Sequence, residues 1–393
     1  MKEERNPMHA GRSWPGAAPA AVLLGAALLG GMLLSVACGP VMLGDSITLL
    51  RLPEGGRLPR AVIDDAGTVH VVYFEGDPRG GDLRYVTRAA GASAWSAPLY
   101  VNSQPGTVVG IGPIDGGQMA LGRDGRLHVV WFKLGRTEFL YTRTKDDGTG
   151  FEPQFALASG EGVEAGPSVA ADRGGNVFVF WHTGEPPDAQ RAVFMTASHD
   201  DGRTFSPTRP VSPAAEGACD CCGLQALVGV TGLSEGELYV SYRGAGDNVR
   251  RGQRLLMSGD GAETFSDLEL DPWEINACPI STTSLANGPD GVAVAWETRG
   301  QVYFKEIHAV EPAWSPAGDA SARRKNPAVA VNDRYETLLA WGDGPGWQSG
   351  GTFHWQLFGG GRTDVDRGTG PEIPAGSFAA VVAEPDGRFL VVF

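Results

Sequence analysis

Four cysteines hold most of the chemistry that this sequence could perform. They are Cys219, Cys221 and Cys222 in the segment A-C-D-C-C-G, and Cys278 in the segment N-A-C-P. Two disulfides are one interpretation, for which four cysteines allow three pairings. Thiolates that bind a soft metal ion such as Cu(I) or zinc, with Asp220 or His182 beside the ligands, are a second. A redox-active pair formed by the adjacent Cys221 and Cys222 is a third.

The first 38 residues predict export. Lys2, Arg5 and Arg12 precede an apolar run over 17–37, and small residues then lead to Cys38. This order is typical of a secretion signal; a transmembrane anchor is the alternative, because the run approaches the ~20 residues that cross a bilayer. The stretch resembles a bacterial lipoprotein signal, which implies a lipid on Cys38 and a membrane-anchored protein of the cell envelope, in the periplasm or on the cell surface. Export favours disulfides among the other cysteines.

The composition restricts both the fold and the partners. The chain of 393 residues contains 57 Gly and 27 Pro, too many helix breakers for a bundle of long helices. Hydrophobic residues make up 42% and charged residues 20%, as in a chain that buries a core. The formal charge of −14 repels phosphate backbones. We therefore expect no nucleic-acid partner, and no membrane contact other than the lipid anchor.

One unit recurs along residues 45–393: an apolar strand, a turn of the D-x-x-G type and a second apolar strand. Its seven copies lie at 60–74, 118–132, 167–182, 224–243, 283–297, 327–341 and 379–393. A period of about 50 residues is typical of a β-propeller, in which neighbouring four-stranded sheets bury each other's faces. The sequence therefore predicts an all-β fold, with one propeller domain over 45–393.

Third strands and the two ends of the chain indicate the number of blades. A third strand follows six of the copies, at 82–88, 137–144, 191–198, 253–258, 301–308 and 352–358. The strand predicted at 46–53 has no partner of its own. Joining it to the last copy would close the ring and remove exposed sheet edges. We predict seven blades, six complete and one built from both ends of the chain, with a six-bladed ring as the alternative. We expect a monomer.

The turns after these third strands carry the sharpest local motif. Residues 198–205, S-H-D-D-G-R-T-F, fit S-x-D-x-G-x-T-F/W fully, and 144–151 and 258–265 fit it with changes. The aspartate accepts backbone N–H bonds, glycine allows a positive φ, and the aromatic ring packs between sheets. The motif resembles the Asp-box repeats of the sialidase superfamily. That resemblance implies that Asp146 and Asp200 are structural and lie on the face opposite the ligand site.

The resemblance extends to the ligand site of the superfamily. Arg57 in R-L-P, with Glu75 downstream in E-G, resembles its R-I-P and E-G-R segments, and Arg243 in V-S-Y-R resembles the segment of its second arginine. These matches imply that Arg57, Arg243 and a third arginine, Arg299, hold a substrate carboxylate. A planar guanidinium suits that role because it binds carboxylates with two hydrogen bonds.

The catalytic set that the resemblance implies is incomplete. The superfamily uses an acidic proton donor, for which Asp77 or Asp82 is the candidate, and a tyrosine polarised by a glutamate. Gln225 stands where the glutamate is expected, and neither 277–284 nor 324–329 contains a tyrosine. The sequence therefore leaves open whether the protein is an enzyme with hydrolytic activity of the sialidase type.

A propeller would bring these residues to one face. Inner strands begin around a central channel, and antiparallel pairing returns the end of each second strand to the same face. We therefore expect the cysteines, Arg57, Arg243, Glu75 and Glu297 to meet at the channel mouth. One functional hypothesis is binding of a glycan or small acidic ligand there. The other is a non-enzymatic protein that binds a metal ion or another protein through its cysteine cluster.

Overall fold

The computed structural model describes residues 41–43, 46–53, 55–133, 135, 138–160, 166–318, 323–345, 349–361 and 363–393. The predicted signal at 1–38, with Cys38, lies outside these residues. In the described part of the chain no helix is long and apolar enough to cross a bilayer. Its helical elements are four short 3-10 turns: η1 (Arg123–Gly125), η2 (Asp188–Gln190), η3 (Ala214–Glu216) and η4 (Gly232–Ser234).

Strands make up seven sheets. The first three are β3 (Arg57–Ile63), β4 (Val69–Glu75), β5 (Asp82–Arg88) and β6 (Leu99–Tyr100); β7 (Gly117–Leu121), β8 (Leu127–Lys133), β9 (Glu138–Arg143) and β10 (Phe155–Ser159); and β11 (Ser168–Ala171), β12 (Val177–Thr183), β13 (Ala192–Ser198) and β14 (Arg209–Pro210). The next three are β15 (Gln225–Val228), β16 (Leu238–Arg243), β17 (Gln253–Ser258) and β18 (Ser266–Asp271); β19 (Ser284–Gly288), β20 (Gly291–Thr298) and β21 (Gln301–Glu306); and β22 (Arg324–Val331), β23 (Thr337–Asp343), β24 (Gly351–Phe358) and β25 (Asp364–Ile373). The seventh is β26 (Ala380–Ala383), β27 (Phe389–Val392), β2 (Ile47–Leu50) and β1 (Val41–Leu43).

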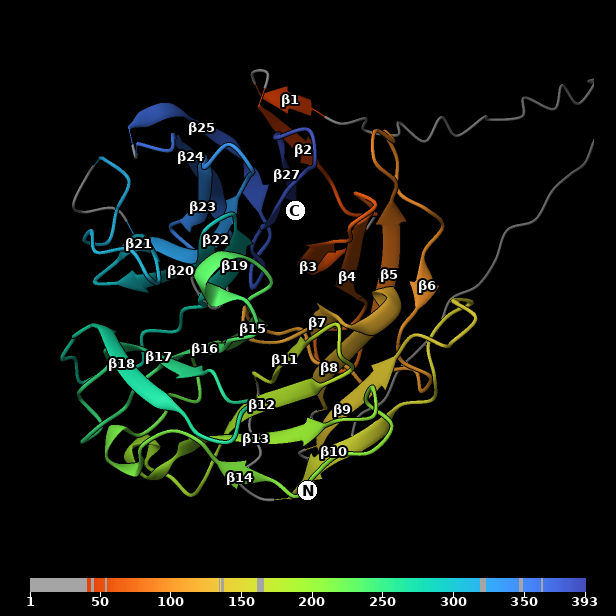
Figure 1. The fold of residues 1–393 in the computed structure, drawn as a ribbon, viewed down its shortest axis with the longest axis vertical. Coiled ribbons are helices and arrows are strands. Elements are labelled where there is room, and N and C mark those ends of the chain that lie inside the picture. Colours follow the sequence, from red (N-terminus) through yellow and green to blue (C-terminus); the bar gives the residue numbers. More distant parts are fainter. Residues whose placement is uncertain are drawn as a thin grey trace, which may run out of the picture. The chain divides into compact units, whose positions relative to one another are not determined.

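The sheets form the blades of a propeller. The first strand of each sheet contacts the first strand of the next, and β26 contacts β3 to complete the ring. Figure 1 shows the sheets arranged around a common centre, where their first strands lie. The seven-bladed prediction is confirmed, and the six-bladed alternative is wrong. The fifth blade has three strands in the described residues, where four were expected; beyond β21 only the single bridge between Phe304 and Trp314 continues the sheet.

The seventh blade joins the two ends of the domain, as predicted. Strand β27 pairs antiparallel with β26 on one side and parallel with β2 on the other, from Ile47 opposite Phe389 to Leu50 opposite Val392. Beyond the paired strands, the N–H of Leu52 donates to the carbonyl of Phe393 at 2.9 Å. Because β27 has partners on both sides, neither end leaves an open inner edge.

Second strands are buried along almost their full length because other blades cover both faces of each sheet. In β12 and β16 every residue is buried except the last of β12. This explains why these segments read as continuous apolar runs, without the alternation of a half-exposed strand. The large rings of Trp131, Trp181 and Trp296, near the ends of second strands, are at most 2% exposed and pack in the clusters between blades.

The turn at 198–205 is held by its own side chains. Asp200 accepts the backbone N–H of Thr204 at 2.8 Å and its hydroxyl at 2.6 Å. The turn at 258–265 has the same bonds between the equivalent aspartate and threonine. Both turns follow third strands, so antiparallel pairing places them at the opposite end of the blades from the start of the inner strands.

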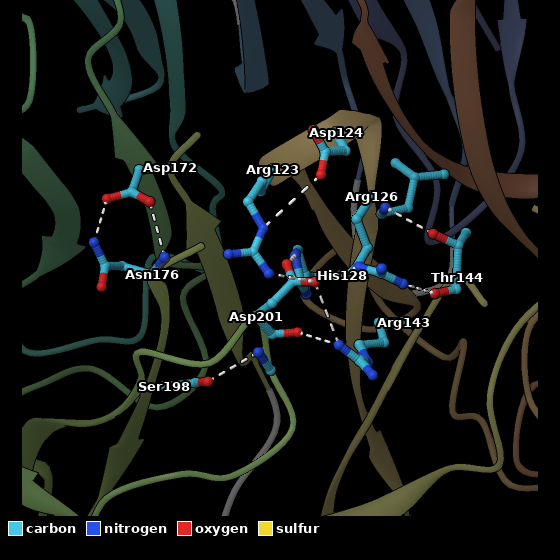
Figure 2. A network of polar contacts seen from close by, with 12 residues as sticks. Arg123, Asp124, Arg126, His128, Arg143, Thr144, Asp172, Asn176, Ser198 and Asp201 are labelled. Atoms are coloured by element: carbon cyan, nitrogen blue, oxygen red, sulfur yellow. Dashed lines mark hydrogen bonds and ion pairs between the residues drawn. The ribbon is translucent and has the colours of Figure 1, made fainter. Parts of the chain in front are cut away.

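A buried ionic network joins the second and third blades at that same end (Figure 2). Asp201, 1% exposed, lies 2.6 Å from Arg126 Nε and 3.4 Å from Arg143 Nη1. Arg126 also pairs with Asp146, a residue predicted to be structural. Beside them, burial lowers the pKa of His128 to about 3, so its ring is neutral. The arginines therefore depend on Asp201 for their buried countercharge.

We expect Asp201→Asn to lower the free energy of unfolding by about 3–5 kcal/mol, because it removes the buried countercharge of Arg126 and Arg143 and leaves them only the more exposed carboxylates of Asp146 and Glu152. Asp124→Asn is the matched control: its φ of 55° resembles the 65° of Asp201, but its side chain is 90% exposed. The control should change stability by less than about 0.5 kcal/mol. Urea unfolding of both variants measures the difference, and equal midpoints would show that the network contributes little.

Candidate functional site

The structure brings all four predicted cysteines together. Cys221, in the loop before β15, and Cys278, in the loop before β19, form a disulfide between adjacent blades with a Cα–Cα distance of 6.7 Å. Cys219 and Cys222 are free thiols. The sulfur of Cys219 lies 3.3 Å from that of Cys221, 3.2 Å from that of Cys222 and 3.8 Å from that of Cys278.

This arrangement differs from two of the three interpretations of the cysteines, the two disulfides and the redox-active pair. There is one disulfide and not two, and it links different blades, whereas the redox interpretation placed it between the neighbours Cys221 and Cys222. The tight turn of the loop is the reason, because the N–H of Cys222 donates to the carbonyl of Cys219 at 3.3 Å and keeps these two side chains together. Their C-x-x-C spacing, typical of thiol and metal sites, is obscured in the sequence by Cys221 between them.

The four sulfurs range from buried to exposed. Cys219 and Cys222 are 0% and 1% exposed, Cys221 is half-buried, and Cys278 is exposed. Backbone bonds fix the buried part, since the N–H of Cys219 donates to the carbonyl of Arg243 at 2.9 Å. The cluster therefore has a rigid inner side and an outer side that solutes can reach.

The surroundings distinguish the two free thiols. Burial alone would raise the pKa of Cys222, but the Cys219 S–H bond, the charge of Arg243 and the backbone N–H groups of Ser281 and Ile280 lower it to about 7. The same S–H bond, together with burial, raises the pKa of Cys219. The pair thus holds a proton on Cys219 and favours a thiolate at Cys222.

Arg243 and Glu297 lie beside this cluster. The guanidinium of Arg243 is 1% exposed, donates to the carbonyls of Arg251 (2.8 Å) and Glu297, and lies 5.5 Å from the ring of Trp273. Its distance to the Glu297 carboxylate is 3.9 Å. Protein groups therefore engage Nη1 and Nη2, whereas Nε has no hydrogen-bond partner in the described residues, and the predicted clamp role of Arg243 stays a prediction.

The other predicted ligand residues lie at the same end of the blades, Arg57 and Glu75 in the first blade and Arg299 in the fifth, which also holds Glu297. Arg57 begins β3 and lies 5.2 Å from the ring of Phe74, and Glu75 ends β4 and pairs with Arg84 at 2.8 Å. Arg299, in the turn after β20, donates to the carbonyl of Pro272 at 2.8 Å. These residues remain predictions for ligand binding.

The candidate proton donors are engaged in turns. Asp77 accepts the N–H of Arg79 at 2.8 Å, and Asp82, at the start of β5, accepts from the Asn102 amide at 2.8 Å. Gln225, at the position expected for a glutamate, accepts the N–H of Leu285 in the next blade at 2.7 Å. These three side chains therefore accept hydrogen bonds within the fold, and the question of hydrolysis stays open.

The residues expected beside the cysteines form a polar group of their own. Asp220 lies 3.4 Å from Arg191. His182, at the end of β12, is fully buried, and neither ring nitrogen has a hydrogen-bond partner in the described residues. Burial and then the charge of Arg191 lower the pKa of His182 to about 4, which leaves the imidazole neutral.

A cavity of about 240 Å³ opens where the inner strands begin. It is lined by Pro113, Ile280, Arg323, Lys325, Asn326, Pro345, Gly376 and Ser377. The ammonium of Lys325 donates to the carbonyls of Pro279 and Ile280, in the loop that carries Cys278. Next to Ser377, the guanidinium of Arg60 lies 4.2 Å from the ring of Phe378 and has no ion-pair partner in the described residues. The cavity wall is therefore cationic.

Comparisons with known proteins identify the fold. No family model matches the sequence, and no curated protein matches it. An α-L-arabinanase of Penicillium chrysogenum, complexed with arabinobiose, matches with TM-score 0.51 and 11% identity over 79% of this chain and 95% of that one. The α-L-arabinofuranosidase arb93a of Fusarium graminearum, with an iminosugar inhibitor, gives TM-score 0.50 and 11% identity over 73% and 88%.

A Hadza microbial sialidase matches with TM-score 0.47 and 15% identity, over 80% of this chain and 71% of that chain. At these identities the likeness concerns the fold alone. The described residues form a seven-bladed propeller, as predicted from the repeats. The function has to be argued from the site itself.

The cysteine pair predicts a thiolate at neutral pH. In the chain with its disulfide intact, ultraviolet absorbance of the thiolate should rise with a midpoint near pH 7, set by Cys222, and not near the usual ~8.5. Cys222→Ser should abolish that step, whereas Cys38→Ser should leave it in place. A single midpoint at the usual value in all three proteins would contradict the prediction.

Proposed function

We propose that this protein binds a soft metal ion, Cu(I) or zinc, through Cys219, Cys221, Cys222 and Cys278. The sulfur positions support the proposal more than any other observation. With metal–sulfur bonds of ~2.3 Å, the ligand atoms of a tetrahedral site lie ~3.8 Å apart. Cys219 has the other three sulfurs at 3.2 to 3.8 Å. Reduction of the disulfide would let its two sulfurs move to comparable spacing.

Charges around the cluster favour thiolates, which are the form that binds metal. Arg243 lowers the pKa of Cys222 by its charge, and the charge of Arg251 lowers that of Cys219, although a sulfur bond and burial outweigh it there. Both arginines are buried, so their field is weakly screened. Four thiolates and one Cu(I) or zinc ion carry a net negative charge, which these arginines reduce.

The chemistry of the ligands favours Cu(I) over hard cations. All four candidate ligands are cysteines, whose thiolates select soft ions, and in the described residues the close group of Cys219, Cys221 and Cys278 includes no carboxylate or imidazole. Zinc is the alternative, since it accepts four thiolates in closed structural sites. The proposal assigns no catalytic step. We place this metal-binding protein in the cell envelope, because the sequence predicts a lipid anchor at Cys38.

The metal proposal predicts a dependence on each buried cysteine. The reduced full chain should bind one Cu(I) or zinc ion, measured by competition with a coloured chelator and by elemental analysis. Cys219→Ser or Cys222→Ser should weaken binding about 100-fold, because each thiolate supplies a large share of the binding free energy. Cys38→Ser, which removes the fifth cysteine, is the control and should bind normally. A reduced chain without metal would refute the proposal.

A second candidate is a small acidic ligand, such as a carboxylated sugar, in the cavity at the channel mouth. The specific observation is the cationic wall: Lys325 and Arg323 line the cavity, and Arg60 nearby has no ion-pair partner in the described residues. Cationic side chains with spare hydrogen-bond donors are suited to carboxylates. Sialosides are the ligands to try first, because they carry a carboxylate.

The cavity predicts binding that depends on Lys325. Saturation-transfer NMR with a free sialic acid should show contact with the wild-type chain, and Lys325→Met should weaken the affinity about tenfold through loss of one charged hydrogen bond. Lys145→Met, in an exposed turn on the opposite face, is the matched control. A fluorogenic sialoside run in parallel reports hydrolysis. Equal binding by both variants would show that the ligand does not use this cavity.

A further inference from the structure

We propose that the Cys221–Cys278 disulfide is a reducible gate on the metal site. While the disulfide is intact, only Cys219 and Cys222 can offer thiolates to an ion. After reduction by an external dithiol, all four sulfurs can do so. This inference rests on the proposed metal-binding function and adds its regulation, together with the chemical class of the reductant.

Exposure makes the disulfide reducible from one side. Cys278 is exposed and Cys221 is half-buried, whereas Cys219 and Cys222 lie behind them at 0% and 1% exposure. Cys278 is therefore the side from which an attacking thiolate can approach the disulfide. The two buried thiols are shielded from oxidants and from exchange with solution thiols, because reactivity of a cysteine requires access.

The two loops stay together without the covalent bond. The N–H of Gly223 donates to the carbonyl of Ser281 at 3.0 Å, which joins the loop of the fourth blade to that of the fifth. Lys325 donates to the carbonyls of Pro279 and Ile280, the two residues that follow Cys278. Here the other links keep the sulfurs grouped when the bond is cut.

The reaction balances as ordinary thiol–disulfide exchange. One thiolate of the dithiol attacks the sulfur of Cys278, which forms a mixed disulfide and releases Cys221 as a thiolate. The second thiol of the reductant then attacks the reductant's other sulfur, the one bonded to Cys278 in the mixed disulfide. This step closes a disulfide within the reductant and releases Cys278 as a thiolate. The reductant leaves as a disulfide, having given up two electrons and two protons. Cys221 and Cys278 then bind those protons or exchange them for the metal ion.

Three of the sulfurs need little movement to receive an ion, because those of Cys219, Cys221 and Cys278 lie within 4.8 Å of one another. Cleavage of the bond lets the sulfurs of Cys221 and Cys278 separate by side-chain rotation toward the ~3.8 Å of a four-thiolate site. Cys222 lies outside this group and has to turn toward it from its contact with Cys219. The gate therefore works by changing ligand number while the blades stay in place.

The test compares Cu(I) binding by the full chain in two states. One sample keeps its disulfide, and the other is reduced with a dithiol that is then removed without air. Differential alkylation and mass spectrometry record the state of each cysteine. We expect reduction to convert Cys221 and Cys278 alone and to raise Cu(I) affinity at least about 100-fold, the effect of two added thiolates.

The double variant Cys221→Ser/Cys278→Ser is the control. It keeps the buried pair, so it should bind Cu(I) as weakly as the disulfide form does, whether or not it has been treated with dithiol. Equal affinity of the two wild-type states overturns the gate and leaves metal binding intact. Absence of binding in both states overturns metal binding and the gate together. A reduced chain that loses its cooperative thermal transition overturns the gate by showing that the disulfide is a staple.

Discussion

Closure of the ring is the constraint on which the rest of the structure depends. Each sheet has two apolar faces, and it can bury both only between neighbours. The parallel pairing of β2 with β27 meets this need at the one place where the chain does not continue from blade to blade. The ends of the ring are joined again at the mouth, where the N–H of Leu58 donates to the Ser377 hydroxyl at 3.0 Å. Residues far apart in the sequence thereby become fixed neighbours.

The cysteine cluster is a direct product of that geometry. Cys221 and Cys278 are 57 residues apart, one repeat of the propeller, so they occupy equivalent loops of adjacent blades. Each loop is anchored at both ends, by the last strand of one blade and the inner strand of the next. Such loops lose little conformational entropy when their side chains converge on an ion or on each other. A site of four sulfurs can therefore be built from short loops.

The sequence repeats predicted the strands and their closure because both depend on local patterns. Apolar runs broken by D-x-x-G turns mark strand positions wherever the blades lie in space. The contacts of Arg243 could not be predicted in the same way. The local pattern places this residue at the end of a strand, but its guanidinium contacts the carbonyls of Arg251 and Glu297, which lie elsewhere in the chain. The disulfide pairing was also left open. It depends on the path of the loop over 211–224 and on side-chain rotamers, which strand periodicity does not determine.

Ile280 is the residue at which the two candidate sites meet. Its φ of 51° is unusual for a β-branched residue, and a backbone of this kind persists only where surrounding contacts determine it. Its N–H faces the sulfur of Cys222, its carbonyl accepts from Lys325 at 3.1 Å, and it lines the cavity at the channel mouth. A ligand that drew the ammonium of Lys325 toward the cavity would release the carbonyl of Ile280. A change of charge at Cys222 would alter the bond between its sulfur and the N–H of the same residue. Because both groups contact one residue with a strained backbone, the cysteine cluster and the cavity share a wall at Ile280.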